Sequence, residues 1–347
     1  MSDYSALDRL LHRLVLDRRF VAETIFDLDQ RIARADGDRV AERAHVFVAG
    51  LARAGTTVLM RRLHATGAFR SLTYRDMPFV LAPNLWRRLS ATARRDVAKG
   101  ERAHGDRLEV DADSPESLDE VFWRIFAGPR YLHSDHLAAH KTDAETRARF
   151  RAYVAAILSA QGAPPAERYL SKNNNNILRL PAIRRTFPNA LLLVPVRAPA
   201  SHAGSLLRQH RRFTEMQRGD RFVERYMRWL AHHEFGLDHR PFRFGEAAPA
   251  AGDPMTIDYW VARWIEAYAW LDAEAPEDTV FVVYEALCAD PTVWERVAAL
   301  AGVPPEIEGD ALSASETAPP EGADPELFAR ADVLYDRLVA RSAARLA

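Results

Sequence analysis

The sequence predicts an α/β protein in which a small parallel sheet is flanked by helices. Three short runs of β-branched, aliphatic and aromatic residues carry this prediction: HVFVAG at 45–50, ALLLVPV at 190–196 and TVFVVY at 279–284. Such runs are typical of strands that are buried on both faces. Segments with a helical spacing of apolar residues lie between them, and this alternation favours parallel strands joined by crossover helices.

The other elements follow from apolar periodicity and from residues that start or stop helices. Residues 1–44 show a helical apolar stripe with a break around Gly37, and RYLSK at 168–172 is expected to form a further strand. Residues 90–113 are polar and charged, so we expect a surface excursion there. Further helices are expected from Ser114, over 143–161, 175–186, 199–217, 221–236, 256–273 and 291–301, and from Pro325.

We expect a single domain over 1–347, because no linker rich in Gly, Ser and Pro divides the chain into balanced halves. Within it, a helical segment at 1–44 precedes a core at 45–303, and a loop and C-terminal helix follow at 304–347. Predicted helices outnumber predicted strands, so the sheet is small for this length and helical insertions surround it.

Composition excludes several classes of protein. The chain has 47 Lys and Arg against 48 Asp and Glu, a net charge of −1, which argues against generic binding of nucleic acid. Cys288 is the only cysteine, so neither an intramolecular disulfide nor a Cys-based zinc site can form. No apolar run approaches the roughly 18 residues of a membrane span, and the N-terminus lacks the apolar stretch of a signal peptide. We therefore expect a cytoplasmic protein.

The segment GLARAGTT, Gly50–Thr57, joins the first predicted strand to a helix. A glycine-containing loop at this point directs backbone N–H groups and the positive end of the helix dipole toward a phosphate-like anion. The spacing of Gly50 and Gly55 matches a phosphate-binding P-loop, which favours a P-loop-like three-layer fold. Thr56 replaces the usual lysine, while a cation is present earlier, at Arg53. The segment thus indicates an anion site rather than an ATPase, although a plain strand–helix turn has the same pattern.

A second candidate for anion binding follows the strand at 190–196. Arg197 ends this strand, and Ser205 lies eight residues further on, in the next helix. Open α/β sheets bind ligands at the carboxyl ends of their strands. There an arginine can bind a phosphate in bidentate fashion, and a serine can add a donor. Each residue alone is also compatible with a structural role, so the pair gains weight only together with the first loop.

Together, Arg-x-Gly-Thr-Thr and the later Arg-x-Pro with its serine resemble the two nucleotide-binding motifs of the sulfotransferases that use 3′-phosphoadenosine 5′-phosphosulfate (PAPS). The resemblance implies that the first motif binds the 5′-phosphosulfate and the second the 3′-phosphate. The implied donor-binding residues are Arg53, Ala54, Gly55, Thr56 and Thr57 in the first motif and Arg197 and Ser205 in the second.

Two further segments resemble this family, so the resemblance covers roughly 45–303. YLSKNN at 169–174 is similar to a lysine segment, which implies that Lys172 contacts the sulfuryl oxygens, and VVYEALCADP at 282–291 is similar to a C-terminal segment. Asn173 and the next asparagine replace the usual Ser/Thr/Asp-Pro. The glycine-rich C-terminal segment of the cytosolic steroid and phenol enzymes is absent, so the chain resembles a bacterial type whose motif spacing is closer to the tyrosylprotein and heparan sulfotransferases.

The resemblance implies transfer of a sulfuryl group from PAPS to a hydroxyl by in-line displacement, with Arg53 and Lys172 stabilising charge and without a metal. The base is less well defined. Asp76 lies 23 residues after Arg53, at about the interval at which tyrosylprotein and heparan-type enzymes place a carboxylate base, and we choose it. The steroid and phenol enzymes use a central histidine instead, so the alternatives that stay open are Glu120, His133 and His136.

The acceptor is expected to be a small hydroxylated molecule, in a pocket shaped by 90–135 and 236–256. His233, Glu234 and His239 lie close together, but the two histidines are poorly spaced for a metal site on a helix, and we interpret them as possible pocket lining. Two other functions remain alternatives at this point. One is a P-loop kinase that acts on a small molecule, and the other is a catalytically inactive module that binds adenosine 3′,5′-bisphosphate.

Overall fold

The computed structural model describes residues 6–90, 100–101, 109–110, 117–160, 167–249, 251–306, 314 and 323–346. Its central sheet has five parallel strands in the order β2-β6-β1-β7-β9. They are β1 Val46–Val48, β2 Phe69–Arg70, β6 Arg168–Lys172, β7 Leu191–Val196 and β9 Val280–Val283. The predicted small parallel sheet is thus confirmed, and the sequence analysis missed only its short edge strand β2.

Alternation along the strands creates two cores, one on each face of the sheet. Val46 and Val48 belong to a smaller core, whereas Phe47 between them belongs to a larger one. The helices that contribute to the smaller core include α4 Thr56–Ala65, α13 Tyr284–Ala289 and α14 Pro291–Leu300. Those that contribute to the larger core include α6 Glu120–Phe126, α8 Ala144–Ser159, α9 Leu180–Thr186, α10 Pro199–Gly219 and α12 Ile257–Glu274. The result is the predicted three-layer arrangement.

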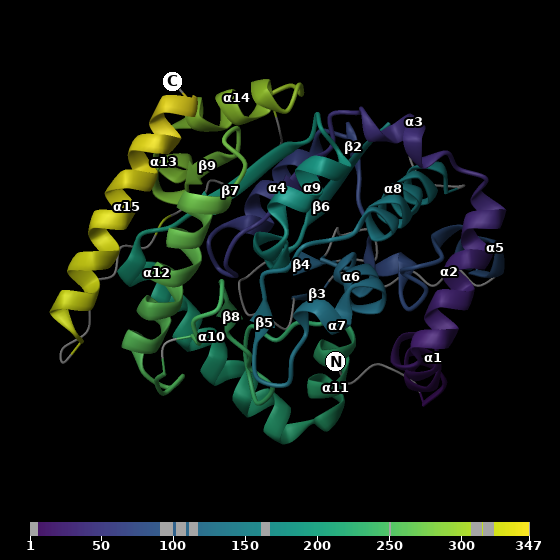
Figure 1. The fold of residues 1–347 in the computed structure, drawn as a ribbon, viewed down its shortest axis with the longest axis horizontal. Coiled ribbons are helices and arrows are strands. Elements are labelled where there is room, and N and C mark those ends of the chain that lie inside the picture. The colour runs from purple at the N-terminus through teal and green to yellow at the C-terminus, as the bar shows by residue number, and fades with distance from the viewer. Residues whose placement is uncertain are drawn as a thin grey trace.

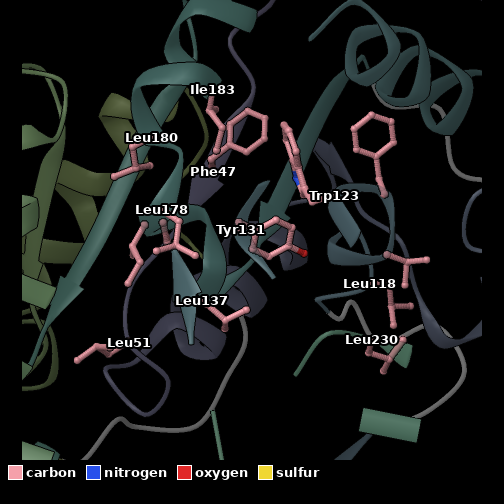
Figure 2. Packing of buried hydrophobic residues seen from close by; sticks show 14 of the residues in the cluster. Phe47, Leu51, Leu118, Trp123, Tyr131, Leu137, Leu178, Leu180, Ile183 and Leu230 are labelled. Atoms are coloured by element: carbon pink, nitrogen blue, oxygen red, sulfur yellow. The ribbon is translucent and has the colours of Figure 1, made fainter. Parts of the chain in front are cut away.

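The larger core is rich in aromatic rings. Figure 2 shows part of it, including Phe47 from β1, Trp123 from α6 and Ile183 from α9. The Phe47 ring stacks on that of Phe187 with 5.6 Å between centroids, so the central strand is fixed to the helical layer by packing of large side chains. This rigid packing supports the carboxyl ends of the strands, where the candidate site lies.

The two ends of the chain pack at opposite sides of the molecule. The predicted helical segment before β1 forms α1 Ala6–Asp17, α2 Arg19–Ala33 and α3 Gly37–Ala41, and Figure 1 shows α1 and α2 in purple, with α2 beside α5. The C-terminal helix α15 Pro325–Leu346, in yellow, runs along α12 and the edge strand β9. The remaining elements are η1 Tyr74–Asp76, α5 Pro83–Ser90, β3 Gly100–Glu101, β4 Glu109–Val110, α7 Gly128–Tyr131, β5 Leu137–Ala138, η2 Asn174–Leu178, α11 Arg221–Trp229 and β8 Phe242–Arg243.

The structure shortens one predicted helix and describes only part of the predicted surface excursion. The helix expected over 221–236 ends at Trp229, because Ala231 adopts a left-handed conformation with φ 52° and redirects the chain. The residues after this turn then enter an irregular segment that reaches β8, which pairs with β5. Of the surface excursion expected over 90–113, only the end of α5 at residue 90 and the antiparallel pair β3–β4 belong to the described residues, and the rest lies outside them.

Candidate active site

The loop between β1 and α4 turns sharply, because Arg53 and Gly55 both adopt left-handed conformations, with φ 71° and 102°. A Cβ atom on Gly55 would lie 2.5 Å from Cδ2 of Tyr284, so the close approach of this ring requires glycine. The N–H of Ala54 bonds within the turn to the carbonyl oxygen of Leu51 at 3.4 Å. Since the first N–H groups of a helix have no partner within it, the start of α4 presents donors and a positive dipole end at the carboxyl edge of the sheet.

The second candidate segment directly contacts this loop. Nη1 of Arg197 donates to the carbonyl oxygen of Arg53 at 3.3 Å, and Nε of Arg53 donates to Oγ of Ser205 at 3.3 Å. Arg197 is only 9% exposed, and its guanidinium lies 5.3 Å from the ring centroid of Tyr284. Two guanidinium groups and one hydroxyl, from segments more than 140 residues apart, therefore lie at one place on the sheet edge.

His202 is a further residue of this region, which the sequence analysis overlooked. Its Nε2 lies 2.8 Å from the carbonyl oxygen of Ala52, in the loop after β1. Burial lowers the pKa of His202 to about 3, so the ring is neutral at pH 7 and Nε2 carries the hydrogen that it donates. His202 and Ser205 are three residues apart in α10, so they share one helix face, and this spacing could have revealed the histidine.

Lys172 lies on the other side of the loop. It ends β6, its register partner in β1 is Val48, and it is 6% exposed. Leu170 packs in the smaller core together with α4, and because side chains two residues apart share a face, Lys172 points to the same side of the sheet. The carboxyl ends of the adjacent strands β6, β1 and β7 thus carry Lys172, the glycine loop and Arg197.

Asn174 joins the loop to a more distant segment. Oγ1 of Thr56, the first residue of α4, donates to Oδ1 of Asn174 at 3.5 Å. Nδ2 of Asn174 in turn donates to Oε1 of Glu234 at 3.0 Å. Asn174 is one of the two asparagines that depart from the family pattern. Its amide oxygen accepts from Thr56 and its amide nitrogen donates to Glu234, so Asn174 links these two residues. Glu234 is thereby held two hydrogen bonds away from the loop.

Asp119 is a buried carboxyl that the sequence analysis did not single out. It accepts hydrogen bonds from Tyr169 at 3.2 Å, Ser171 at 2.6 Å and Asn173 at 3.1 Å. Tyr169 and Ser171 alternate along β6 and Asn173 follows its end, so these residues face the side of the sheet opposite to Lys172. Burial raises the pKa of Asp119 to about 6, although the hydrogen bonds oppose this rise. The alternating polar residues in RYLSKNN were the available signal.

Among the candidate bases, Glu120 is fully buried in an ion pair. Its carboxylate accepts from Nη1 and Nη2 of Arg179, both at 3.0 Å, from Asn173 at 2.7 Å and from the hydroxyl of Tyr131. The Arg179 guanidinium carbon lies 4.7 Å from the ring centroid of Trp123 and 4.8 Å from that of Tyr131, and Figure 2 shows these two rings in the larger core. Both carboxylate oxygens are occupied by these partners, so the pair acts as a structural anchor beneath the sheet edge.

Asp76 lies after the edge strand β2 and closes a short 3₁₀ turn. Its Oδ2 accepts from the backbone N–H of Thr73 at 2.9 Å and from the Thr73 hydroxyl at 3.3 Å. Oδ1 lies 3.7 Å from Nη2 of Arg87, so its ion pair is with this arginine rather than with the adjacent Arg75. The carboxyl is 2% exposed. In this structure Asp76 therefore holds the turn together and keeps one oxygen without a hydrogen-bond partner among the described residues.

The two histidine candidates lie in the turn between α7 and β5. The rings of His133 and His136 stack with 4.4 Å between their centroids, and Nδ1 of His136 lies 2.8 Å from Asp135. Neither histidine lines the cavity described next. Segment 90–135 was also expected to shape the acceptor pocket, but none of its described residues lines that cavity.

A cavity opens beside the loop after β1. Leu51 and Ala52 of the loop form one wall, and α10 adds Leu206, the neighbour of Ser205. Glu234 and His239 line it, whereas His233 is buried against Asp238 at 3.2 Å. The other lining residues are Phe235, Arg240, Pro241, Phe242, Phe244, Trp260, Arg263 and Glu266. Segment 236–256, expected to shape a pocket, does supply a large part of this wall.

No three His, Cys, Asp or Glu side chains in the described part of the chain gather closely enough to hold a metal ion. No described helix is both long enough and apolar enough to cross a membrane.

Comparison with known proteins gives a family match. A family model described as the sulfotransferase family matches residues 45–243, which is more than half of the chain. No curated protein matches the sequence.

Similar solved structures include three bacterial sulfotransferases. Sulfotransferase STF9 from Mycobacterium avium is 20% identical, with 86% of this chain and 68% of that chain covered and a TM-score of 0.41. Sulfotransferase STF1 from Mycobacterium tuberculosis H37Rv is 15% identical, with coverage of 98% and 87% and a TM-score of 0.49. A sulfotransferase from Alicyclobacillus acidocaldarius is 16% identical, with coverage of 88% and 96% and a TM-score of 0.35.

Proposed function

Because the chain belongs to the sulfotransferase family, we propose that it transfers a sulfuryl group from PAPS to a hydroxyl group of a small acceptor. The observation that carries the choice of donor is the direct contact of the two segments predicted to bind anions, through Arg197, Arg53 and Ser205. PAPS carries anionic groups at its 3′ and 5′ positions, and a site for it needs two separate sets of cations and donors close together. The carboxyl edge of this sheet offers both.

In this proposal the loop binds the 5′-phosphosulfate. The N–H groups at the start of α4, from Gly55 to Thr57, donate to its oxygens, and the helix dipole favours the negative charge. Arg53 adds a positive charge. Ala54 can contribute only its backbone N–H, which bonds weakly within the turn to the carbonyl oxygen of Leu51. Arg197 and Ser205 bind the 3′-phosphate, with the guanidinium held in place by its contact with the Tyr284 ring.

The reaction is an in-line displacement at sulfur. The acceptor oxygen forms a bond to sulfur while the bond from sulfur to the phosphate oxygen breaks, and the acceptor proton passes to a base. Lys172 and Arg53 stabilise the negative charge that develops on the sulfuryl and leaving oxygens, and each such contact lowers the activation free energy by on the order of 3 kcal/mol. Asp76 remains our proposed base, and its Oδ1, which has no hydrogen-bond partner among the described residues, would accept the acceptor proton.

A thermal-shift experiment tests the donor assignment. Adenosine 3′,5′-bisphosphate should raise the melting temperature more than 5′-AMP or ATP with Mg²⁺, because only it carries the 3′-phosphate for Arg197. Arg197→Ala should remove this preference. Arg168→Ala is a matched control, because Arg168 bonds two backbone carbonyls at the opposite end of β6, from Nε and Nη2. It should lower stability and keep the preference.

Three results would overturn the proposal. Equal stabilisation by 5′-AMP and the bisphosphate would show that no 3′-phosphate site exists, and a preference for ATP with Mg²⁺ would favour a kinase. Specific binding of the bisphosphate, without release of it from PAPS with any hydroxylated acceptor, would identify an inactive binding module.

A further inference from the structure

The cavity beside the loop contains an arginine whose donors the protein uses only in part. Arg263, in α12, is 6% exposed, and its Nη2 donates to Glu266 at 2.6 Å. The guanidinium also interacts with the Tyr259 hydroxyl, but its Nε and Nη1 atoms are buried and make no hydrogen bond of normal geometry to the described residues. Buried guanidinium N–H groups without an acceptor are costly, so such groups in a cavity wall indicate a ligand that supplies the acceptor.

The other arginine in the same wall provides a contrast. All three nitrogens of the Arg240 guanidinium are bonded: Nε and Nη2 donate to Asp238 at 3.2 and 2.9 Å, and Nη1 donates to the His133 carbonyl at 2.7 Å. Arg240 therefore shapes the wall without needing a ligand. The unbonded donors at Arg263 are thus a property of one position rather than of arginines in this cavity generally.

The charges of the wall argue for a neutral ligand. Arg240 and Arg263 are balanced there by Glu234 and Glu266, and Arg263 already has Glu266 as its counter-ion. Burial lowers the pKa of His239 to about 4, so that ring adds no charge at pH 7. What Arg263 lacks is a hydrogen-bond acceptor and not a negative charge, and a carboxylate would leave the cavity with a net negative charge.

The remaining wall is apolar and aromatic. Phe235, Phe242, Phe244 and Trp260 line the cavity, and the ring of Tyr259 lies 5.0 Å from the guanidinium carbon of Arg263. Such walls favour a ligand with an aromatic or alicyclic body. Burial raises the pKa of Tyr259, and the guanidinium opposes this rise, so the phenol stays protonated at pH 7 and adds no charge either.

We propose that this cavity binds the acceptor, and that the acceptor is a neutral hydroxylated molecule with an aromatic or alicyclic body and a carbonyl oxygen that accepts from Arg263. This inference rests on the proposed function, because the cavity wall includes Leu51 and Ala52 of the donor loop. The hydroxyl of the acceptor then points toward that loop, where its oxygen bonds to sulfur, the bisphosphate leaves and the proton passes to the base. Arg263 is a residue for specificity and takes no part in bond breaking.

The test compares three phenols that differ at one end only, far from the hydroxyl. They are the ketone para-hydroxybenzylacetone, its hydrocarbon counterpart para-butylphenol and the acid para-hydroxyphenylpropionate, with a second set built on cyclohexanol. Each is assayed with PAPS for kcat and KM. The ketone should exceed the hydrocarbon and the acid by roughly 10- to 100-fold in kcat/KM, as expected for one hydrogen bond from a charged group.

Variants separate specificity from a structural effect. Arg263→Met keeps the length of the side chain and should abolish the advantage of the ketone by raising its KM, with the hydrocarbon unchanged. Arg240→Met removes an equal charge from the same wall and should keep the advantage. A ketone without advantage in both sets, or an equal loss for ketone and hydrocarbon in Arg263→Met, would overturn the inference.

The donor assay distinguishes failure of the inference from failure of the proposed function. Adenosine 3′,5′-bisphosphate should stabilise the wild type, Arg263→Met and Arg240→Met alike. If it does so and the ketone is not preferred, only the inference about the acceptor is wrong. If it stabilises none of them and no acceptor is sulfated, the proposed function itself is wrong.

Discussion

The glycine at the start of α4 offers a sharp test of the loop. Gly55→Ala adds one methyl group where φ is 102° and where the ring of Tyr284 would lie 2.5 Å from the new carbon. Gly67→Ala is the matched control, because Gly67 follows the other end of α4 with φ 71° and a Cβ atom there meets nothing within 4 Å. Both variants place alanine in a left-handed conformation, and only one collides with a ring.

The expected magnitudes follow from this difference. The left-handed conformation alone costs about 1–2 kcal/mol of stability in either variant. At Gly55 the ring or the loop must also move by about 1 Å to restore an ordinary contact distance. A shift of about 1 Å in groups that position a substrate reduces the rate on the order of 100-fold. Gly55→Ala should therefore lose donor affinity and turnover, whereas Gly67→Ala should lose stability alone.

The assay measures urea unfolding, binding of adenosine 3′,5′-bisphosphate and turnover of PAPS for both variants. Similar losses of stability with a selective loss of binding and turnover at position 55 would support the reasoning. If both variants bind the nucleotide and turn over PAPS equally well, the approach of Tyr284 to the loop does not shape the donor site and the argument fails.

Three further predictions concern buried polar groups. His45 donates from Nε2 to the Val40 carbonyl and accepts at Nδ1 from the Tyr169 N–H, and burial lowers its pKa to about 4. The neutral ring therefore contributes on the order of 3 kcal/mol to the free energy of unfolding above pH 6.5, and this contribution is lost as the pH falls toward 4. The urea midpoint should therefore fall less between pH 6.5 and 4 in His45→Gln than in the wild type, and an equal fall in both would contradict this. Arg179→Met leaves a carboxylate unpaired in the core and should cost about 3–5 kcal/mol in urea unfolding, part of which the double variant with Glu120→Gln should recover; no recovery would argue against the pair. Lys172→Met should lower kcat about 100-fold while the bisphosphate still binds, and a loss confined to nucleotide affinity would assign it to ground-state binding.

Much of the fold could be predicted from the sequence because its signals are local. The strand at 168–172 was predicted with the bounds that the structure has, since RYLSK lies between clear breaks, and β1, β7 and β9 differ from the predictions only at their ends. The edge strand at Phe69–Arg70 was missed, because two residues that pair only with β6 carry no periodicity of their own. The early end of α11 depends on one left-handed residue, Ala231, and alanine gives no sequence signal for such a turn.

The candidate site divides in the same way. Spacing along the chain was sufficient to single out the glycine loop, Arg197 and Ser205, because a strand end followed by a helix is a local pattern. Lys172 was singled out only by the resemblance of its segment to the sulfotransferase family. Contacts between distant segments depend on strand order and on packing in three dimensions, which no local pattern encodes. The tertiary structure alone therefore revealed that Asn174 links the loop to Glu234, that Asp119 is buried behind β6, and that Arg263 lines a cavity beside the loop.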